Sequence, residues 1–380
     1  MLVPFLVALI VSMGASLVLT PVVRWGATWV GAVDRPGGRR VHLSPVPRLG
    51  GLAIFAGYFI GEAAAWLTVR AGWFGVEHKA VLYPGHASLR RIFLVSVAVV
   101  LLGVWDDIRG ASGVRKLLVQ MVIALLAVSL GFRIDLLTSP TGGAIPTGIF
   151  SGPLTVIWML ALLNSMNLID GIDGLAAGLA IIASLALFSI AVLRGNVEIA
   201  LLLVGLVGAC LGFVRHNLHP ASIFMGDTGS LFLGSTLALI TILASFKSAA
   251  AIALSFPLVV LAIPLAEASL TTVRRALRGQ PILQADRSHI HHRLLEWGLS
   301  MPQAVTVIYA VAGAMGLAAV AVAGLTWGLV LPAVAALLVA GTLGLRVLLR
   351  LAPPRPDAEP GAGAKPARRR LGGDGSEGSP

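Results

Sequence analysis

Apolar runs long enough to cross a lipid bilayer recur along almost the whole chain. A helix needs about 20 apolar residues to span the hydrocarbon core. Only 12% of the 380 residues are charged, about half the share found in a soluble domain. The sequence therefore predicts an all-α polytopic membrane protein with about 11 transmembrane helices. The candidate spans are residues 2–23, 49–69, 90–105, 115–132, 153–168, 174–193, 198–214, 229–246, 250–272, 303–323 and 326–349.

The positive charges of the loops set the expected orientation. If the N-terminus lies outside, the cytoplasmic segments hold 20 of the 28 Lys and Arg residues, and the opposite loops hold seven. Cytoplasmic loops are normally the richer in these residues, so we expect an outer N-terminus and a cytoplasmic C-terminus. The first apolar run has no basic segment before it and no small-residue cleavage site, which indicates a retained span rather than a signal peptide.

Composition divides the chain into two parts. Residues 1–350 are expected to form one transmembrane domain, whereas residues 351–380 have almost no large apolar side chains to form a folded core and indicate a disordered cytoplasmic tail. The single cysteine, Cys210, excludes an intrachain disulfide. The net charge of +11 favours contact with anionic lipids or anionic substrates. Because the basic residues are spread over separate loops, we expect no binding to nucleic acid.

Carboxylates are scarce, and five of the 17 Asp and Glu residues fall in three short motifs. A carboxylate within lipid is costly and usually has a function. The predicted topology places all three motifs on the cytoplasmic side, where they would form one acidic, Mg²⁺-binding site. The motifs are VWDDIRG with Asp106 and Asp107, NLIDGIDGL with Asp170 and Asp173, and FMGDTGS with Asp227.

The adjacent acids of the first motif need a positive partner. Asp106 and Asp107 would repel each other, and the pKa of at least one would rise, unless a metal ion or a lysine such as Lys116 lies between them. The plainer interpretation is a solvated pair at a helix end whose charge is balanced by Arg109 and Arg115. The motif alone leaves both interpretations open.

The other two motifs combine acids with glycines. Asn167, Asp170 and Asp173 recur every three residues and would share one broad face of a helix, or they form a polar cap and turn. Asp227 lies between glycines before an apolar span, where a loop can offer backbone N–H groups to phosphate and a carboxylate to a metal. Asp227 could equally be the N-cap of that span.

Two basic segments are candidates for binding phosphate. ADRSHIHHRLLEWG holds three histidines within four residues, and these could donate hydrogen bonds to phosphate oxygens, with arginine beside them. Zinc is a second interpretation, although no cysteine or HExxH partner accompanies them, and a solvated loop is a third. The first loop, DRPGGRRVH, could hold a lipid phosphate or could only set the topology. The residues concerned are His289, His291, His292, Arg287, Arg40 and His42.

Together these motifs resemble the polyprenyl-phosphate N-acetylhexosamine-1-phosphate transferase family, of glycosyltransferase 4 type, over about residues 1–350. The resemblance rests on DRPGGRRVHLSPVPRLGG, on the acidic pair followed by Lys116, on Asn-x-x-Asp-Gly-x-Asp-Gly at 167–174 and on Gly-Asp-x-Gly-Ser at 226–230. His-Ile-His-His at 289–292 is similar to the WecA and TagO branch rather than to MraY. The chain departs from the family at Glu267, where Asp is usual, and at Arg40, where Lys is common.

The resemblance implies transfer of GlcNAc-1-phosphate from UDP-GlcNAc to undecaprenyl or another polyprenyl phosphate, with release of UMP. It implies a multi-pass plasma-membrane enzyme with a cytoplasmic active site, whose members often form dimers. Mg²⁺, or Mn²⁺, would be held by Asp227 with Asn167, and Asp106 or Asp107 would orient or deprotonate the lipid phosphate. The remaining residues would bind substrate. Asp170 and Asp173 would bind the nucleotide or support the metal ligands, and Arg40 and His42 would hold the lipid phosphate. His289, His291, His292 and Arg287 would hold the sugar phosphate, and Lys116 would also contact substrate.

Three alternatives stay open at this point. The same chemistry could use another UDP-N-acetylhexosamine or UDP-MurNAc-pentapeptide as donor. An ion-coupled transporter would use the carboxylates as an ion path, but it predicts acids at mid-membrane depth rather than at one face. A catalytically inactive scaffold is the third alternative, against which the intact motifs argue.

Overall fold

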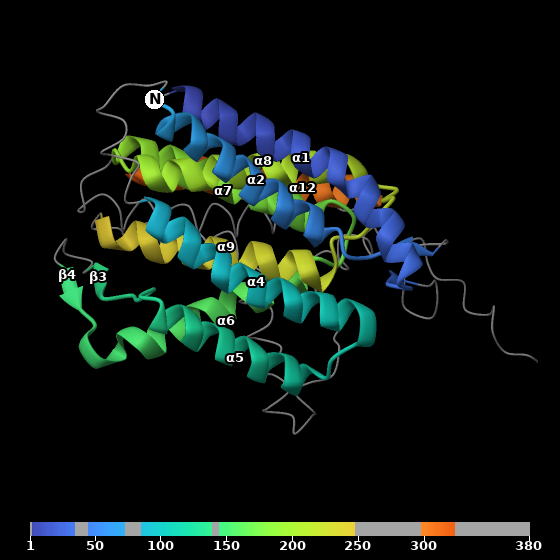
Figure 1. Cartoon of the computed structure of the whole chain (residues 1–380), viewed down its shortest axis with the longest axis horizontal. Helices are drawn as coiled ribbons and strands as arrows, with labels where there is room; N and C mark the ends of the chain where they lie inside the picture. Colours follow the sequence, from blue (N-terminus) through green and yellow to red (C-terminus); the bar gives the residue numbers. More distant parts are fainter. Residues whose placement is uncertain (1, 35–44, 73–84, 139–143, 248–297, 324–380) are drawn as a thin grey trace, which may run out of the picture.

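The computed structural model describes residues 2–34, 45–72, 85–138, 144–247 and 298–323. In this part of the chain, long helices lie side by side as a bundle, and short hairpins occupy some of the connections (Figure 1). The helices are α1 (Leu2–Trp29), α2 (Gly51–Arg70), α4 (Gly85–Arg109), α5 (Gly113–Ser129), α6 (Ser151–Ile169), α7 (Leu175–Leu193), α8 (Val197–Asn217), α9 (Gly226–Lys247) and α12 (Met301–Ala323).

Each of these helices overlaps one of the predicted apolar runs. Eight stretches of the described residues are long and apolar enough to cross a membrane. The ninth helix, α5, has 17 residues and is shorter than the roughly 20 that a span needs. The prediction of a polytopic helical membrane protein is confirmed. The runs 250–272 and 326–349 and the tail 351–380 lie outside the described residues, so the total of 11 spans and the orientation of the termini stay predictions.

The connections contain short strands that the sequence did not indicate. β1 (Val33–Asp34) pairs antiparallel with β2 (Val46–Pro47), and β3 (Leu136–Thr138) pairs antiparallel with β4 (Ala144–Pro146). A single 3₁₀ turn, η1 (Gly148–Phe150), leads into α6. Strands of two or three residues are too short to produce an alternating apolar pattern, so hydropathy could not predict them.

Helix α9 lies at the centre of one half of the bundle. It packs against α4, α6 and α2, and α5 packs on the outer side of α6 (Figure 1). In the other half, α1 packs against α2 and α8, and α7 packs between α8 and α12. Leu231, Phe232, Leu233, Leu239 and Ile242 of α9 are fully buried, so this helix is held on several sides.

Small residues allow the closest helix contacts. Ala8, Ser12, Ser16 and Thr20 recur every four residues along the buried face of α1, which meets glycines of α2 and α8. A Cβ atom at Gly61 would lie 1.9 Å from Ser12 Oγ. Such small faces let helix backbones approach closely within a membrane, where apolar burial gives little driving force.

Candidate active site

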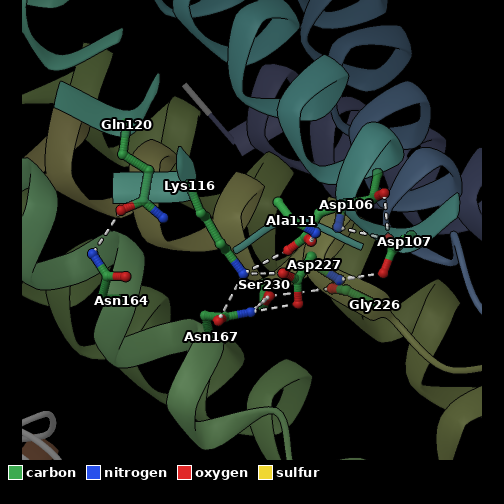
Figure 2. A network of polar contacts seen from close by, with 11 residues as sticks. Asp106, Asp107, Ala111, Lys116, Gln120, Asn164, Asn167, Gly226, Asp227 and Ser230 are labelled. Atoms are coloured by element: carbon green, nitrogen blue, oxygen red, sulfur yellow. Dashed lines mark hydrogen bonds and ion pairs between the residues drawn. The ribbon is translucent and has the colours of Figure 1, made fainter. Parts of the chain in front are cut away.

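Four helix ends meet at the end of the bundle where α4 turns into α5 (Figure 1). The last turn of α4 carries Asp106, the first turn of α5 carries Lys116, the last turn of α6 carries Asn167 and the first turn of α9 carries Asp227. Figure 2 shows these side chains pointing toward one another. The predicted convergence of the three acidic motifs is therefore confirmed.

The ammonium group of Lys116 lies among three of these side chains. Its Nζ atom is 2.9 Å from Asp106 Oδ2 and 3.1 Å from Asn167 Oδ1, and it forms an ion pair with Asp227 Oδ2. The Lys116 side chain is only 13% exposed and that of Asp106 only 12%. The Asp227 side chain is 26% exposed. Two neighbouring carboxylates with so little access to water are stabilised by a cation between them, and Lys116 supplies it. The expectation that Lys116 relieves the acidic motif is confirmed for Asp106.

Hydrogen bonds fix the orientation of the Asn167 amide. Its Nδ2 atom donates to Asp227 Oδ1 at 2.7 Å and to Ser230 Oγ at 3.0 Å (Figure 2). Ser230 in turn donates to the Gly226 carbonyl at 3.1 Å. With both amide hydrogens engaged by α9, the amide oxygen faces Lys116.

Asp107 has a different role from its neighbour, because it caps α9 from another helix. One carboxylate oxygen accepts from Asp227 N at 2.9 Å, and the other accepts from Thr228 N at 2.9 Å and from Thr228 Oγ1 at 2.6 Å. The first N–H groups of a helix have no partner within it, and a negative charge there also suits the helix dipole. The N-cap function that the sequence suggested for Asp227 thus belongs to Asp107.

Two glycines permit this capping arrangement. Gly226 has a φ of +72°, and a Cβ atom there would lie 2.5 Å from Asp107 Oδ2. A Cβ atom at Gly103 of α4 would lie 2.4 Å from Thr228 Cα. The backbones of α4 and α9 therefore approach closely enough for a short aspartate side chain to span the gap.

A tight turn returns the chain from α4 to α5. Gly110 takes a φ of +70°, and the Ala111 N–H donates to Asp106 Oδ1 at 2.5 Å. Ser112 then caps α5 by accepting from Arg115 N at 3.4 Å. This turn places Lys116 opposite Asp106, ten positions earlier in the chain.

Asp170 lies at the C-terminal end of α6, close to the same acids. Burial raises its pKa well above the usual range, and the carboxylates of Asp227, Asp107 and Asp173 raise this pKa further, whereas Arg48 lowers it. The site therefore holds more negative charge than Lys116 alone neutralises. Among the described residues no three His, Cys, Asp or Glu side chains are grouped as metal ligands. Oxygens for a cation would come from the two carboxylates of Asp106 and Asp227 together with the Asn167 amide.

Comparison with known proteins identifies the family. The model of glycosyl transferase family 4 matches residues 89–245. A probable undecaprenyl-phosphate N-acetylglucosaminyl 1-phosphate transferase of Bacillus subtilis is 38% identical over 304 residues, covering 80% of each chain. The chain belongs to glycosyl transferase family 4.

Two further relatives show the breadth of glycosyl transferase family 4. A decaprenyl-phosphate N-acetylglucosaminephosphotransferase of Mycobacterium tuberculosis is 36% identical over 314 residues, covering 76% of this chain and 74% of its own. A phospho-N-acetylmuramoyl-pentapeptide-transferase of Limosilactobacillus fermentum is 33% identical over 208 residues, covering 52% of this chain and 59% of its own. The match to the first of these relatives thus extends over more of this family 4 chain.

Asp173 makes its hydrogen bonds outside the cluster around Lys116 in this family 4 protein. Helix α6 ends at Ile169, so the expectation that Asn167, Asp170 and Asp173 share one helix face is wrong. Asp173 Oδ2 instead accepts from Ala221 N at 3.1 Å and lies 2.8 Å from His219 Nδ1, in the loop between α8 and α9. The sequence analysis missed His219 as the partner of Asp173, because His219 belongs to none of the motifs.

The first-loop motif of the family 4 chain docks against the FMGDTGS motif. Phe224 N donates to the Pro47 carbonyl at 2.8 Å, and the N–H groups of Gly50 and Gly51 donate to the carbonyls of Phe224 and Met225 at 3.0 and 2.9 Å. Arg48 extends from this loop and forms an ion pair with Asp34. The sequence analysis considered this loop as a binding site for a lipid phosphate but did not single out Arg48.

The remaining predicted site residues of this family 4 chain lie outside the described residues, and their roles stay predictions. They are Arg40, His42, Arg287, His289, His291 and His292.

Proposed function

We propose that the protein transfers GlcNAc-1-phosphate from UDP-GlcNAc to undecaprenyl or another polyprenyl phosphate, releasing UMP and forming polyprenyl-diphospho-GlcNAc. Two relatives are named for this acceptor class and this sugar. The match to each of them covers at least 76% of this chain and at least 74% of the relative. The observation that carries the proposal is the cluster of Asp106, Lys116, Asn167 and Asp227 at one end of a bundle of membrane-length helices. The product would start a cell-envelope polysaccharide.

The choice of sugar rests on two arguments. The muramoyl-pentapeptide relatives match about half of this chain, whereas the N-acetylglucosamine relatives match between 73% and 80% of it. The His-Ile-His-His sequence at 289–292 points the same way, because it is similar to the WecA and TagO branch. UDP-MurNAc-pentapeptide and other UDP-N-acetylhexosamines are therefore the competing donors to be tested.

The donor atoms of the cluster fit Mg²⁺, with Mn²⁺ as a substitute. Mg²⁺ prefers oxygen ligands, and it is usually held by one or two carboxylates together with substrate phosphates and water. Asp227 and Asn167 would hold it, with Asp106 as a further oxygen donor. When bound, the ion would neutralise charge on the diphosphate as the phosphorus–oxygen bonds change.

The protein's own residues would bring two anions together. In the reaction, an oxygen of the acceptor phosphate forms a bond to the β-phosphorus of UDP-GlcNAc, and the bond from that phosphorus to the bridging oxygen breaks, so that UMP leaves. Phosphoryl transfer depends mainly on positioning and on neutralising charge. Asp106 would orient the acceptor phosphate or accept its proton, and Lys116 would offset its negative charge. Asp170 and Asp173, near the loop that carries His219, would bind the nucleotide.

The reaction is proposed for the cytoplasmic face of the plasma membrane. The predicted topology places every acidic motif on that side. The acids of the three motifs also gather at one end of the bundle, and among the described residues Glu62 is the only acid near the middle of a helix, which argues against a continuous ion path. A homodimer stays a prediction.

The test is a reconstituted assay with purified protein in detergent. Protein is incubated with polyprenyl phosphate, Mg²⁺ and one of three donors: UDP-GlcNAc, UDP-GalNAc or UDP-MurNAc-pentapeptide. We expect UMP release with UDP-GlcNAc, loss of release on chelation, and little release with the other two. Release with only another donor would overturn the choice of sugar. If folded protein releases UMP with none of the donors, the transferase proposal fails.

A further inference from the structure

The carboxylate and amide oxygens of the cluster are not equally available to a cation. Asp106 Oδ1 accepts from the Ala111 N–H and Asp227 Oδ1 accepts from Asn167 Nδ2. Both oxygens of Asp107 accept from the first turn of α9. The oxygens directed at the centre of the cluster are therefore those that contact Lys116: Asp106 Oδ2, Asn167 Oδ1 and Asp227 Oδ2.

The ammonium of Lys116 thus stands where a metal ion would bind. A nitrogen that contacts three converging oxygens fills the space in which a divalent ion sharing those oxygens would lie, at about 2.0–2.1 Å from each for Mg²⁺. Two cations on the same three oxygens would also repel each other strongly, because the surrounding side chains are largely shielded from water. The lysine and the metal ion therefore compete for one position.

We propose that Lys116 is a resident cation that holds the acidic cluster together in the metal-free protein, and that an arriving divalent ion displaces its ammonium from these oxygens. The displaced ammonium, still protonated, becomes available to a phosphate group of the substrates. The inference rests on the proposed function, which supplies both the metal ion and the phosphates. In this order of events the metal ion binds first. It then frees the Lys116 ammonium to contact the anionic substrate.

The chemistry of lysine suits such an exchange. A lysine ammonium is a compact point charge on a flexible four-carbon stem, whereas an arginine is a rigid planar fork. Lys116 lies in the first turn of α5, next to exposed positions Gly113, Val114 and Arg115. The Lys116 backbone can therefore stay in place while its side chain turns toward the exposed N-terminal end of α5.

The direct test is metal affinity in the absence of substrates. Mn²⁺ binding to the detergent-purified full chain is followed by electron paramagnetic resonance for wild type and for Lys116→Met. The variant has no ammonium to displace, so we expect its Mn²⁺ affinity to be at least about tenfold tighter. This magnitude follows the about 1–3 units by which an adjacent charge shifts the proton affinity of a carboxylate. Equal or weaker affinity in Lys116→Met would overturn the proposal.

A matched control separates competition from a general change in charge. Arg115→Met removes the same charge from the adjacent, exposed position of α5. We expect its Mn²⁺ affinity to equal that of wild type. If Arg115→Met tightens binding as much as Lys116→Met does, the effect is only electrostatic attraction at long range and the proposal is wrong.

A second measurement uses the wild-type protein, so that it holds even if Lys116→Met fails to fold. The rate of acetylation of Lys116 by an amine-reactive ester is measured by mass spectrometry with and without Mg²⁺, relative to the other lysines of the chain. Displacement predicts faster acetylation of Lys116 with Mg²⁺, and an unchanged or slower rate contradicts it. UMP release by wild type is measured separately: release without these metal effects refutes the lysine exchange alone, and the metal effects without release refute the transferase.

Discussion

At the scale of single residues, the two adjacent aspartates of VWDDIRG contact different partners. Asp106 contacts the Lys116 ammonium at 2.9 Å, whereas Asp107 accepts three hydrogen bonds from the start of α9. Their neighbouring positions in one helix turn direct them to different partners. The sequence alone treated the two as equivalent candidates for the catalytic group, whereas in the structure both oxygens of Asp107 accept hydrogen bonds from α9 and Asp106 contacts Lys116.

This division predicts different consequences of removing each carboxylate. Hydrogen bonds to charged groups contribute about 1.5–3 kcal/mol each, so Asp107→Ala should lower the free energy of unfolding by at least about 2 kcal/mol. Asp106→Ala should lower turnover strongly while changing the thermal unfolding midpoint less. Thermal unfolding in detergent and UMP release, measured on both variants, check the two expectations. The opposite pattern, a stable Asp107→Ala and an unstable Asp106→Ala, would refute the division.

Asp227 is the residue whose substitution tests the metal assignment. Asp227→Asn removes a charge from the proposed ligands while keeping the size of the side chain. Metal ions provide several kcal/mol of transition-state stabilisation, and each 1.4 kcal/mol is a factor of ten. We therefore expect Mg²⁺-dependent turnover to fall at least about 100-fold. Asp135→Asn, beyond the opposite end of α5, is the control and should keep wild-type turnover; near-wild-type turnover in Asp227→Asn would contradict the assignment.

Asp170 predicts a dependence of stability on pH. A carboxyl whose pKa is raised in the folded state destabilises the protein at any pH above its unfolded-state pKa of about 3.9, and most above the raised folded value. In metal-free buffer Asp170→Asn should therefore raise the thermal midpoint at neutral pH. This gain should shrink as the pH falls through the folded-state pKa. Asp173→Asn is the control that should gain nothing, since Asp173 already accepts from Ala221 N.

At the scale of helices, polar pairs between α5 and α6 hold the site in register. One turn beyond the Lys116–Asn167 contact, Asn164 Nδ2 donates to Gln120 Oε1 at 2.8 Å (Figure 2). Hydrogen bonds between membrane helices contribute about 0.6 kcal/mol on average. The two contacts together align α5 with α6, so that Lys116 is opposite Asn167 rather than a turn away. Hydropathy and motifs do not show that Gln120 is the partner of Asn164, because that contact depends on how the two helices are rotated.

The approach of α4 to α9 gives the prediction at this scale. In Gly103→Ala the new Cβ atom would meet the Thr228 backbone at 2.4 Å, and overpacking of this kind costs about 1–3 kcal/mol. We expect a lower thermal midpoint together with reduced UMP release, because the shift separates Asp107 from the start of α9. Gly14→Ala on α1 has nothing within 4 Å and should be tolerated. If both variants unfold alike, close packing of α4 on α9 is not what places the site.

At the scale of the whole molecule, the sequence predicted the helices well and their contacts only in part. Lengths of apolar sequence directly reflect bilayer thickness, and each described helix overlaps an expected run. The meeting of three acidic motifs followed from topology alone. The sequence did not show which oxygen faces which partner. Asp107 caps α9 at Thr228, 121 positions later in the chain, and Asp173 pairs with His219, 46 positions later. Such contacts depend on how helices rotate about their axes, which hydropathy does not specify.

The predicted orientation of the bundle can be tested with two matched positions. Ser112 and Asn196 are both N-cap residues whose side chains accept from the backbone three residues later, so Ser112→Cys and Asn196→Cys lose an equivalent hydrogen bond. Ser112 begins α5 at the site end, and Asn196 lies in the turn between α7 and α8 at the opposite end. Each is placed in a Cys210→Ser background.

Intact cells are then treated with a membrane-impermeant maleimide. If the site is cytoplasmic, Asn196→Cys is labelled in intact cells and Ser112→Cys only after permeabilisation. The reverse pattern would place the acidic cluster outside, and the count of positive charges would then have misassigned the topology. Labelling of both positions in intact cells would mean that the bundle does not separate two compartments at these ends, which contradicts the membrane-spanning arrangement on which the acceptor-lipid proposal depends.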